Sequence, residues 1–324
     1  MVAVLWVVGF IFAIVECVLG VLLNFYIIAL NVADWRRGLP LSLCDKILVL
    51  MAINNIGLQC DMNICTFLYI VFPEMVQYPK IYSPISVFLV FQFYFSFWIT
   101  AALCIFYCLR IVSFKIHFFM HLKANITHVV TKFLIVSGVG SFVFSLLSVW
   151  EINIKRSIIT GNVTSDLLTM DSNMKVSSIT GNVSAIPWMI DTSIEMREIY
   201  KYLTIVLGCC LPFILTILSI ILTLTSLWTH TCSMKNNSSG FCIPRLDAHI
   251  RAARIMLLLT ILYAIFYLSE VSLLASSLSI ESTWELLSLF FVLIYPTTQS
   301  SIVILGNSKL CPTFLKSLWL GKKF

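Results

Sequence analysis

Seven long runs of apolar residues constrain this 324-residue chain more than any other feature. Each run reaches the length of about 20 residues that a helix needs to cross the hydrocarbon core of a bilayer. A helix also pairs its backbone polar groups internally, as lipid requires. The runs lie at approximately Ala3–Leu30, Asp45–Phe72, Pro84–Val112, Val129–Trp150, Tyr200–Thr229, Ile255–Leu278 and Leu286–Leu305. The sequence therefore predicts an all-α membrane protein, a bundle of seven transmembrane helices.

The composition agrees with a chain that is solvated by lipid. Hydrophobic residues make up 60% of the chain and charged residues 11%, whereas a soluble domain is about 25% charged. The net charge of +6 comes from basic residues that stand singly between the apolar runs. This spread indicates membrane topology and does not form the basic patch that nucleic acid would need.

The lysines and arginines predict the orientation of the bundle. Fifteen of the 21 flank the first, third and fifth loops or lie in the tail, and six lie on the opposite side. Loops rich in Lys and Arg remain in the cytoplasm. We therefore expect a cytoplasmic C-terminus and an extracellular N-terminus.

The loop at about 151–199 is the longest and is extracellular in this topology. Ser157–Thr164 recurs as Ser177–Ser184, and each copy carries an N-glycosylation sequon, at Asn162 and Asn182. The repeat has two compatible explanations, a tandem duplication in a tolerant loop and a pair of glycans that assist folding and delivery to the surface.

The tail at 307–324 is predicted to lie apart from the bundle at 1–306, as an amphipathic helix on the inner leaflet. Pro312 suits a first helical turn. Apolar and basic side chains divide between two faces, so that one face contacts acyl chains and the other anionic headgroups. Whether Cys311 is palmitoylated stays open.

Sequence templates for catalysis and for metal binding fit poorly. His117 and His121 are four residues apart, but the segment lacks the glutamate base of a zinc protease. The fifth loop spaces its cysteines and histidines unlike a structural zinc site. We therefore predict a protein that is not an enzyme and that binds no metal or cofactor.

Polar residues inside the apolar runs are costly, so they are expected to face the interior of the bundle. Glu16, Gly20 and Asn24 recur every four residues and share one face of the first helix. Asn55 and Gln59 lie in the second run. Such residues form either a polar core that switches between two arrangements or static hydrogen bonds between helices.

Six ordered strings resemble the type 2 (bitter) taste receptors, a family of G-protein-coupled receptors. They are the Glu16, Gly20, Asn24 spacing, Met51–Gln59, Phe97–Ile111, Pro212–Met234, Asp247–Arg254 and Tyr295–Leu310. The motifs Asp-Arg-Tyr, Cys-Trp-x-Pro and Asn-Pro-x-x-Tyr of rhodopsin-like receptors are absent from the sequence. The loop at 151–199 contains no cysteine, as in the taste receptors.

The chain departs from the family pattern in its polar residues. Asn54-Asn55 stands where the family usually has Ser-Arg, and Gln299 stands where it has His. Both replacements are polar, so a hydrogen-bonded core is still expected. Glu16 loses the arginine that would be its natural partner.

The resemblance implies a receptor of the plasma membrane that binds small bitter compounds and activates a heterotrimeric G protein of the gustducin type. Its implied pocket faces outward and is mainly apolar, which favours hydrophobic agonists. Glu270 is the implied contact for a basic nitrogen of an agonist. The alternative for the aromatic residues of this pocket is a place in the core or against lipid. The implied ligand pocket consists of Leu89, Phe93, Tyr94, Phe266, Tyr267 and Glu270. The implied switch consists of Glu16, Asn24, Asn55, Tyr263, Pro296, Gln299 and Ser300, and the implied G-protein face of Tyr107, Arg110, His230, His249 and Arg254.

Two other classes of membrane protein compete with this interpretation. A pheromone-type chemosensory receptor would share the bundle and differ in its inner motifs. A transporter would show paired repeats or broken helices with charges inside the membrane, and the repeat found here lies in a loop.

Overall fold

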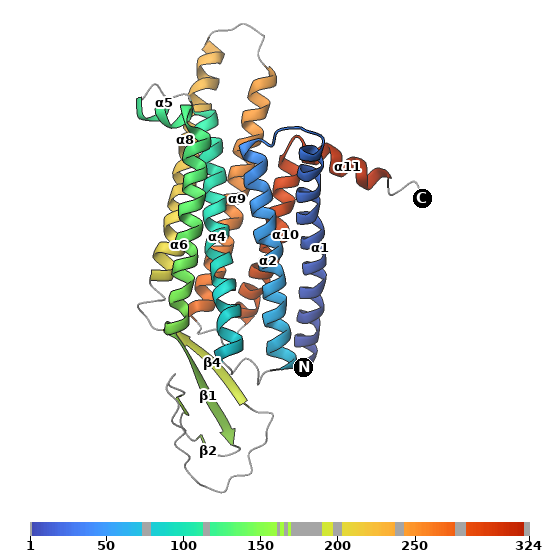
Figure 1. Cartoon of the computed structure of the whole chain (residues 1–324), viewed down its shortest axis with the longest axis vertical. Helices are drawn as coiled ribbons and strands as arrows, with labels where there is room; N and C mark the ends of the chain where they lie inside the picture. Colours follow the sequence, from blue (N-terminus) through green and yellow to red (C-terminus); the bar gives the residue numbers. More distant parts are fainter. Residues whose placement is uncertain are drawn as a thin grey trace.

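The computed structural model describes residues 2–72, 79–112, 117–160, 163–164, 168–169, 190–196, 203–236, 243–275 and 283–320. Within these residues, seven helices are long and apolar enough to cross a membrane, which confirms the predicted fold class. They run side by side as one bundle (Figure 1). They are α1 (Val2–Arg36), α2 (Leu43–Val71), α4 (Pro79–Ile111), α6 (Ile126–Glu151), α8 (Leu211–Asn236), α9 (Ile243–Ala275) and α10 (Thr283–Gly306).

The turn between α1 and α2 shows how local sequence sets helix ends. Gly38 takes a φ of 78° just after α1 ends, a conformation that glycine adopts without a steric penalty. Ser42 then caps α2, because its hydroxyl accepts from the Asp45 backbone N–H and the Asp45 carboxylate accepts from the Ser42 N–H. This reciprocal pair satisfies two donors at the start of the helix.

Helix α4 occupies the middle of the bundle. It packs against α2, α6, α8 and α9, while α10 closes the ring by packing against α1 and α9. Large apolar side chains on the outer faces, such as Phe25 and Val136, are exposed. Lipid tails are their natural solvent, so this surface is expected of a membrane-spanning chain.

The two ends of the bundle differ in what they carry (Figure 1). We call them the loop end, which bears the strands β1 (Ile152–Thr160) and β4 (Ile190–Met196), and the tail end, which bears α11 (Leu310–Leu320) and the short helix α5 (His117–Ala124). At the tail end, Lys309 binds Asp34 at 2.8 Å and the Asn31 side-chain oxygen at 2.7 Å. These contacts hold the start of α11 against α1.

The long loop contains a small sheet that the sequence did not lead us to expect. Strand β1 (Ile152–Thr160) pairs with β4 (Ile190–Met196) in antiparallel register from Ile152↔Met196 to Ile158↔Ile190. The short strands β2 (Val163–Thr164) and β3 (Leu168–Thr169) also pair with β1. The predicted glycosylation sites Asn162 and Asn182 lie outside the described residues.

Candidate functional site

Five aromatic rings fill the centre of the bundle toward the loop end. This aromatic cluster consists of Phe93, Phe97, Tyr263, Phe266 and Tyr295, all buried. The Phe266 ring lies 5.5 Å from Phe93, 5.2 Å from Phe97 and 4.0 Å from Tyr295, stacked on the last at 15°. The cluster therefore joins α4, α9 and α10 through one central ring.

Three of the predicted pocket residues lie nearer the loop end than the aromatic cluster. Leu89 precedes Phe93 by one helical turn on α4, and Glu270 follows Phe266 by one turn on α9. Leu89, Tyr267 and Glu270 are each half-buried, and the Tyr267 hydroxyl lies 3.1 Å from the Cys210 sulfur. Phe93 and Phe266 are thus core residues, which would form the floor of the predicted pocket.

Tyr94 lies apart from the other predicted pocket residues. Its ring packs against Phe144 at 5.4 Å and lines a separate cavity of about 380 Å³ between α4, α6 and the start of the fifth span. Successive side chains on a helix point about 100° apart, so Phe93 and Tyr94 face different neighbours. Gly208 is required beside Tyr94, because any side chain there would collide with its ring.

The fifth span begins with a π-helix, η1 (Thr204–Cys210), which ends two residues before Pro212. A π-helical turn leaves carbonyl groups without their usual helical partners and is common at functional sites. The Tyr263 hydroxyl donates to the Cys209 carbonyl at 2.7 Å, and its ring meets Phe97 at 4.4 Å. Tyr263, predicted as part of the switch, thus ties α9 to the irregular turn of the fifth span.

Tyr295 connects the aromatic cluster to buried polar groups deeper in the bundle. Its hydroxyl accepts from the Gln299 amide at 2.9 Å and lies 3.2 Å from the Ser96 hydroxyl. The same Gln299 amide donates to the Thr100 hydroxyl at 2.9 Å. One face of Tyr295 therefore packs on Phe266 while its hydroxyl joins α10 to α4.

Four of the predicted switch residues form one hydrogen-bonded unit. This polar core consists of Asn24, Asn55, Gln299 and Ser300, and all four are buried. The Asn55 amide donates to Gln299 Oε1 at 2.8 Å and lies 3.4 Å from Asn24 Oδ1. Asn55 thereby links α2 to both α1 and α10, and the polar replacements of the family residues bond directly to each other.

The Ser300 hydroxyl has two acceptors at equal distance. It lies 2.7 Å from Asn24 Oδ1 and 2.7 Å from the carbonyl of Pro296. A hydroxyl has one hydrogen to donate. Rotation of this group therefore exchanges a bond between helices for a bond within α10, next to the proline inside that helix.

Glu16 contributes its backbone to this region. Its carbonyl accepts from the Gln59 amide at 2.9 Å, while Oε2 of its carboxylate has no hydrogen-bond partner among the described residues. Gln59 also donates to the Thr297 hydroxyl at 2.7 Å. The carboxylate of Glu16 thus stands outside the polar core, although it shares a helix face with Asn24.

The residues predicted for the G-protein face lie at the tail end. Arg110 is exposed in the last turn of α4, with its guanidinium 5.9 Å from the Phe106 ring. The Tyr107 hydroxyl lies 3.4 Å from the Cys44 sulfur. On α9, Arg254 is exposed and His249 is half-buried, and His230 lies in α8. These positions leave two guanidinium groups accessible at the tail end.

Tyr295 and Thr100 belong to the site although the sequence did not single them out, whereas Gln59 was expected among the polar residues of the second run. A signal for Tyr295 was present, because it precedes Gln299 by four residues and so shares its helix face. Threonine carries no such signal, since its hydroxyl also bonds to its own helix, as Thr100 does to Ser96. Among the residues that the structure describes, no group of three or more His, Cys, Asp or Glu side chains could hold a metal.

Comparison with known proteins gives a consistent result along the chain. The family model described as taste receptor protein (TAS2R) matches residues 1–322. The chain is 30% identical to human taste receptor type 2 member 9 over 310 residues, which covers 95% of this chain and 92% of the relative. It is 30% identical to Gallus gallus taste receptor type 2 member 40 over 92% of this chain and 89% of the relative.

Proposed function

The chain belongs to the type 2 taste receptors, and from this premise we propose that it is a bitter receptor with an outward-facing pocket for small hydrophobic compounds. One observation carries the proposal: Phe266 stacks on Tyr295 at 4.0 Å, and the Tyr295 hydroxyl enters the polar network. An agonist that rests on the aromatic cluster thereby acts on Tyr295, whose hydroxyl joins the hydrogen bonds between helices deeper in the bundle.

The proposed agonist site lies at the loop end, above the floor of Phe93 and Phe266. Leu89 and Tyr267 supply apolar and aromatic surface from two helices, and Glu270 supplies a carboxylate. Small-molecule sites generally combine apolar walls with few polar groups that fix orientation. The same arrangement fits hydrophobic agonists, some of which carry a basic nitrogen.

The proposed signal path runs from this floor to the tail end. Tyr295, Gln299 and Asn55 bond in sequence from α10 to α2, and Ser300 has two alternative acceptors. The two acceptors define two states of the bundle, and a ligand shifts the equilibrium between these states by its differential affinity for them. The bistable element that we propose is therefore the polar core, and Pro296 and Pro212 are the points where the helices bend.

The proposed partner at the tail end is a heterotrimeric G protein of the gustducin type. The orientation that this requires, with the tail end in the cytoplasm, follows the excess of Lys and Arg there. Arg110 and Arg254 present exposed guanidinium groups on α4 and α9. We propose that they contact the carboxyl-terminal helix of the G-protein α-subunit. On the opposite side of the membrane, we propose that Asn162 and Asn182 carry glycans.

A calcium assay in cells that coexpress a gustatory G-protein chimera tests the function. We expect at least one member of a bitter compound panel to raise cytosolic calcium in cells that express the receptor and to have no effect in mock-transfected cells. Surface labelling controls for delivery. Silence across the panel at confirmed surface expression would contradict the proposal.

Replacing Glu270 with glutamine tests the charged contact in the pocket. Because the carboxylate is proposed to bind a basic nitrogen, we expect the potency of cationic agonists to fall about tenfold, as for loss of one charge-assisted hydrogen bond. Neutral agonists should keep their potency, which provides the matched control in the same variant. Equal potency of cationic agonists on both receptors would exclude Glu270 as their contact.

A further inference from the structure

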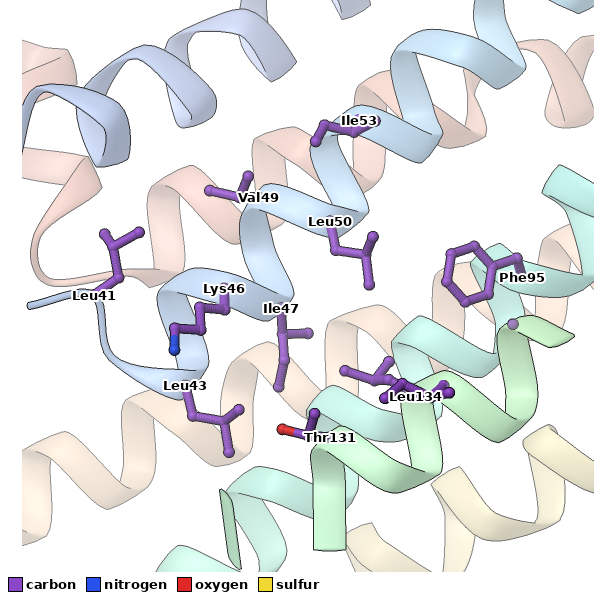
Figure 2. Close-up of a pocket in the computed structure, with 12 residues that line it drawn as sticks. Leu41, Leu43, Lys46, Ile47, Val49, Leu50, Ile53, Phe95, Thr131 and Leu134 are labelled. Carbon is purple, nitrogen blue, oxygen red and sulfur yellow. The ribbon is translucent and has the colours of Figure 1, made fainter. Parts of the chain in front are cut away.

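A groove between α2, α4 and α6 opens on the outer face of the bundle in its tail-end half. It encloses about 560 Å³. Figure 2 shows Leu50 and Ile53 on α2, Leu134 on α6 and Phe95 on α4 as parts of its wall. Its lining is almost wholly apolar and, apart from Leu41 just before α2, lies within three membrane-spanning segments. The groove therefore contacts the interior of the bilayer.

A single lysine lines the tail end of this groove. Lys46 lies in the first turn of α2, and Figure 2 shows its amino group beside Leu43 at that end. Lys46 is exposed and forms no ion pair with any residue that the structure describes. The neighbouring carboxylate of Asp45 is engaged by Ser42 and lies 3.6 Å from Lys309. The charge of Lys46 is thus available to a ligand.

We propose that the groove binds an anionic glycerophospholipid, with an acyl chain along the apolar wall and the phosphate on Lys46. The proposal rests on the orientation proposed above, which places Lys46 at the cytoplasmic leaflet. That leaflet holds the anionic lipids, and basic pockets between transmembrane helices on that side recognise their headgroups.

Charge and shape together identify this occupant. A sterol would fill apolar space but offers no negative group for the ammonium of Lys46. A free phosphate would meet the charge but leave the apolar wall exposed. An anionic phospholipid satisfies both requirements. Its charged headgroup lies at one end and its acyl chain extends away from it, just as the apolar wall of the groove extends away from Lys46. Such a lipid contacts α2, α4 and α6 at once and holds them together.

Photo-crosslinking in nanodiscs tests the proposal. Purified receptor is placed in phosphatidylcholine nanodiscs that carry a trace of phosphatidylserine with a photoreactive acyl chain, and labelled peptides are mapped. We expect labels within residues 43–53 and 131–138. Lys46→Gln should lower this labelling about fivefold, the effect of one lysine near an anionic surface.

Arg37→Gln is the matched charge control. Arg37 also lies at the tail end, is 75% exposed in its side chain and does not line the groove, so labelling should be unchanged. Because both leaflets of the nanodisc contain the probe, the result does not depend on orientation or on signalling. Failure here would therefore leave the proposed receptor function intact.

A second pair of variants tests the acyl chain. Ile53→Trp fills the groove from its lipid side, and Ile214→Trp places the same ring on α8; the two isoleucines are 55% and 52% exposed. We expect the first variant, and not the second, to abolish labelling of the groove. The proposal is overturned if Lys46→Gln and Arg37→Gln label equally, if a phosphatidylcholine probe labels as well as phosphatidylserine, or if a sterol displaces the label.

Discussion

Replacing Phe266 with alanine is expected to lower the free energy of unfolding of the bundle by about 3–5 kcal/mol, the range for removing a buried phenylalanine ring. Phe266 is 0% exposed and contacts rings of α4 and α10. Helices in lipid associate mainly by packing, since apolar surface gains little by leaving lipid. The loss of the central ring therefore removes contacts that no lipid chain can replace. Thermal unfolding of the detergent-solubilised receptor measures the effect.

Phe25→Ala is the control for this prediction. Phe25 is 61% exposed on the lipid face of α1, so lipid fills the space that the ring leaves. We expect little change in its unfolding temperature. Equal losses in the two variants would show that Phe266 is not a central packing residue, and would also remove the floor on which the proposed agonist site rests.

Hydrophobicity predicted the seven spans, because each depends on local composition and length alone. The sixth span was predicted to begin near Ile255, whereas helix α9 begins at Ile243 and its membrane-spanning part at His249. Polar residues such as Asp247 and Arg251 precede Ile255. They are compatible with a helix that extends beyond the bilayer into water, which a hydropathy pattern does not distinguish from a loop.

The polar core was predictable as a helix face but not as a set of bonds. Spacing placed Glu16, Gly20 and Asn24 on one side of α1. The structure shows that Gly20 gives room to Gln59, whose amide lies where a side chain at position 20 would be. Gln59 then bonds the Glu16 carbonyl. Such pairing depends on how helices rotate against one another, and one sequence does not specify that rotation.

The sheet in the long loop and the π-helix depend on contacts that are distant in sequence. Residue 152 pairs with residue 196, and neither segment shows a turn signal that would bring them together. The π-helix places Cys209 so that its carbonyl meets Tyr263 on α9. Both features are set by partners on other segments, so local propensity carries little information about them.

Replacing Asn55 with leucine is expected to abolish the agonist response at normal surface expression. Leucine has the branching and the number of side-chain heavy atoms of asparagine, so the core stays filled while Gln299 Oε1 loses its donor at 2.8 Å. Leaving a buried polar group unpaired costs about 1–3 kcal/mol, more than the roughly 0.6 kcal/mol of an average hydrogen bond between membrane helices. The bundle should survive this cost, while the connection of α2 to α10 through the polar core is lost; the bond from Gln59 to Thr297 remains. The calcium assay, normalised to surface labelling, measures the response.

Asn54→Leu is the neighbouring control. Its amide donates to the carbonyl of Gln92 at 3.2 Å, and a helical carbonyl retains its own partner within the helix. We therefore expect a smaller loss of stability and a preserved response. If both variants signal like the parent chain, the polar core is not part of the switch.

The double variant Asn55→Leu, Gln299→Leu separates the two explanations of the polar core. Replacing both partners by apolar groups of similar shape removes the unpaired acceptor and is often nearly neutral for stability. A static role predicts that stability and signalling recover together. A switching role predicts that stability recovers while the response stays absent, because Tyr295 then has no bonded route to α2. We expect the second result, since the Ser300 hydroxyl, with two acceptors at 2.7 Å, already provides the alternative arrangement that a switch requires.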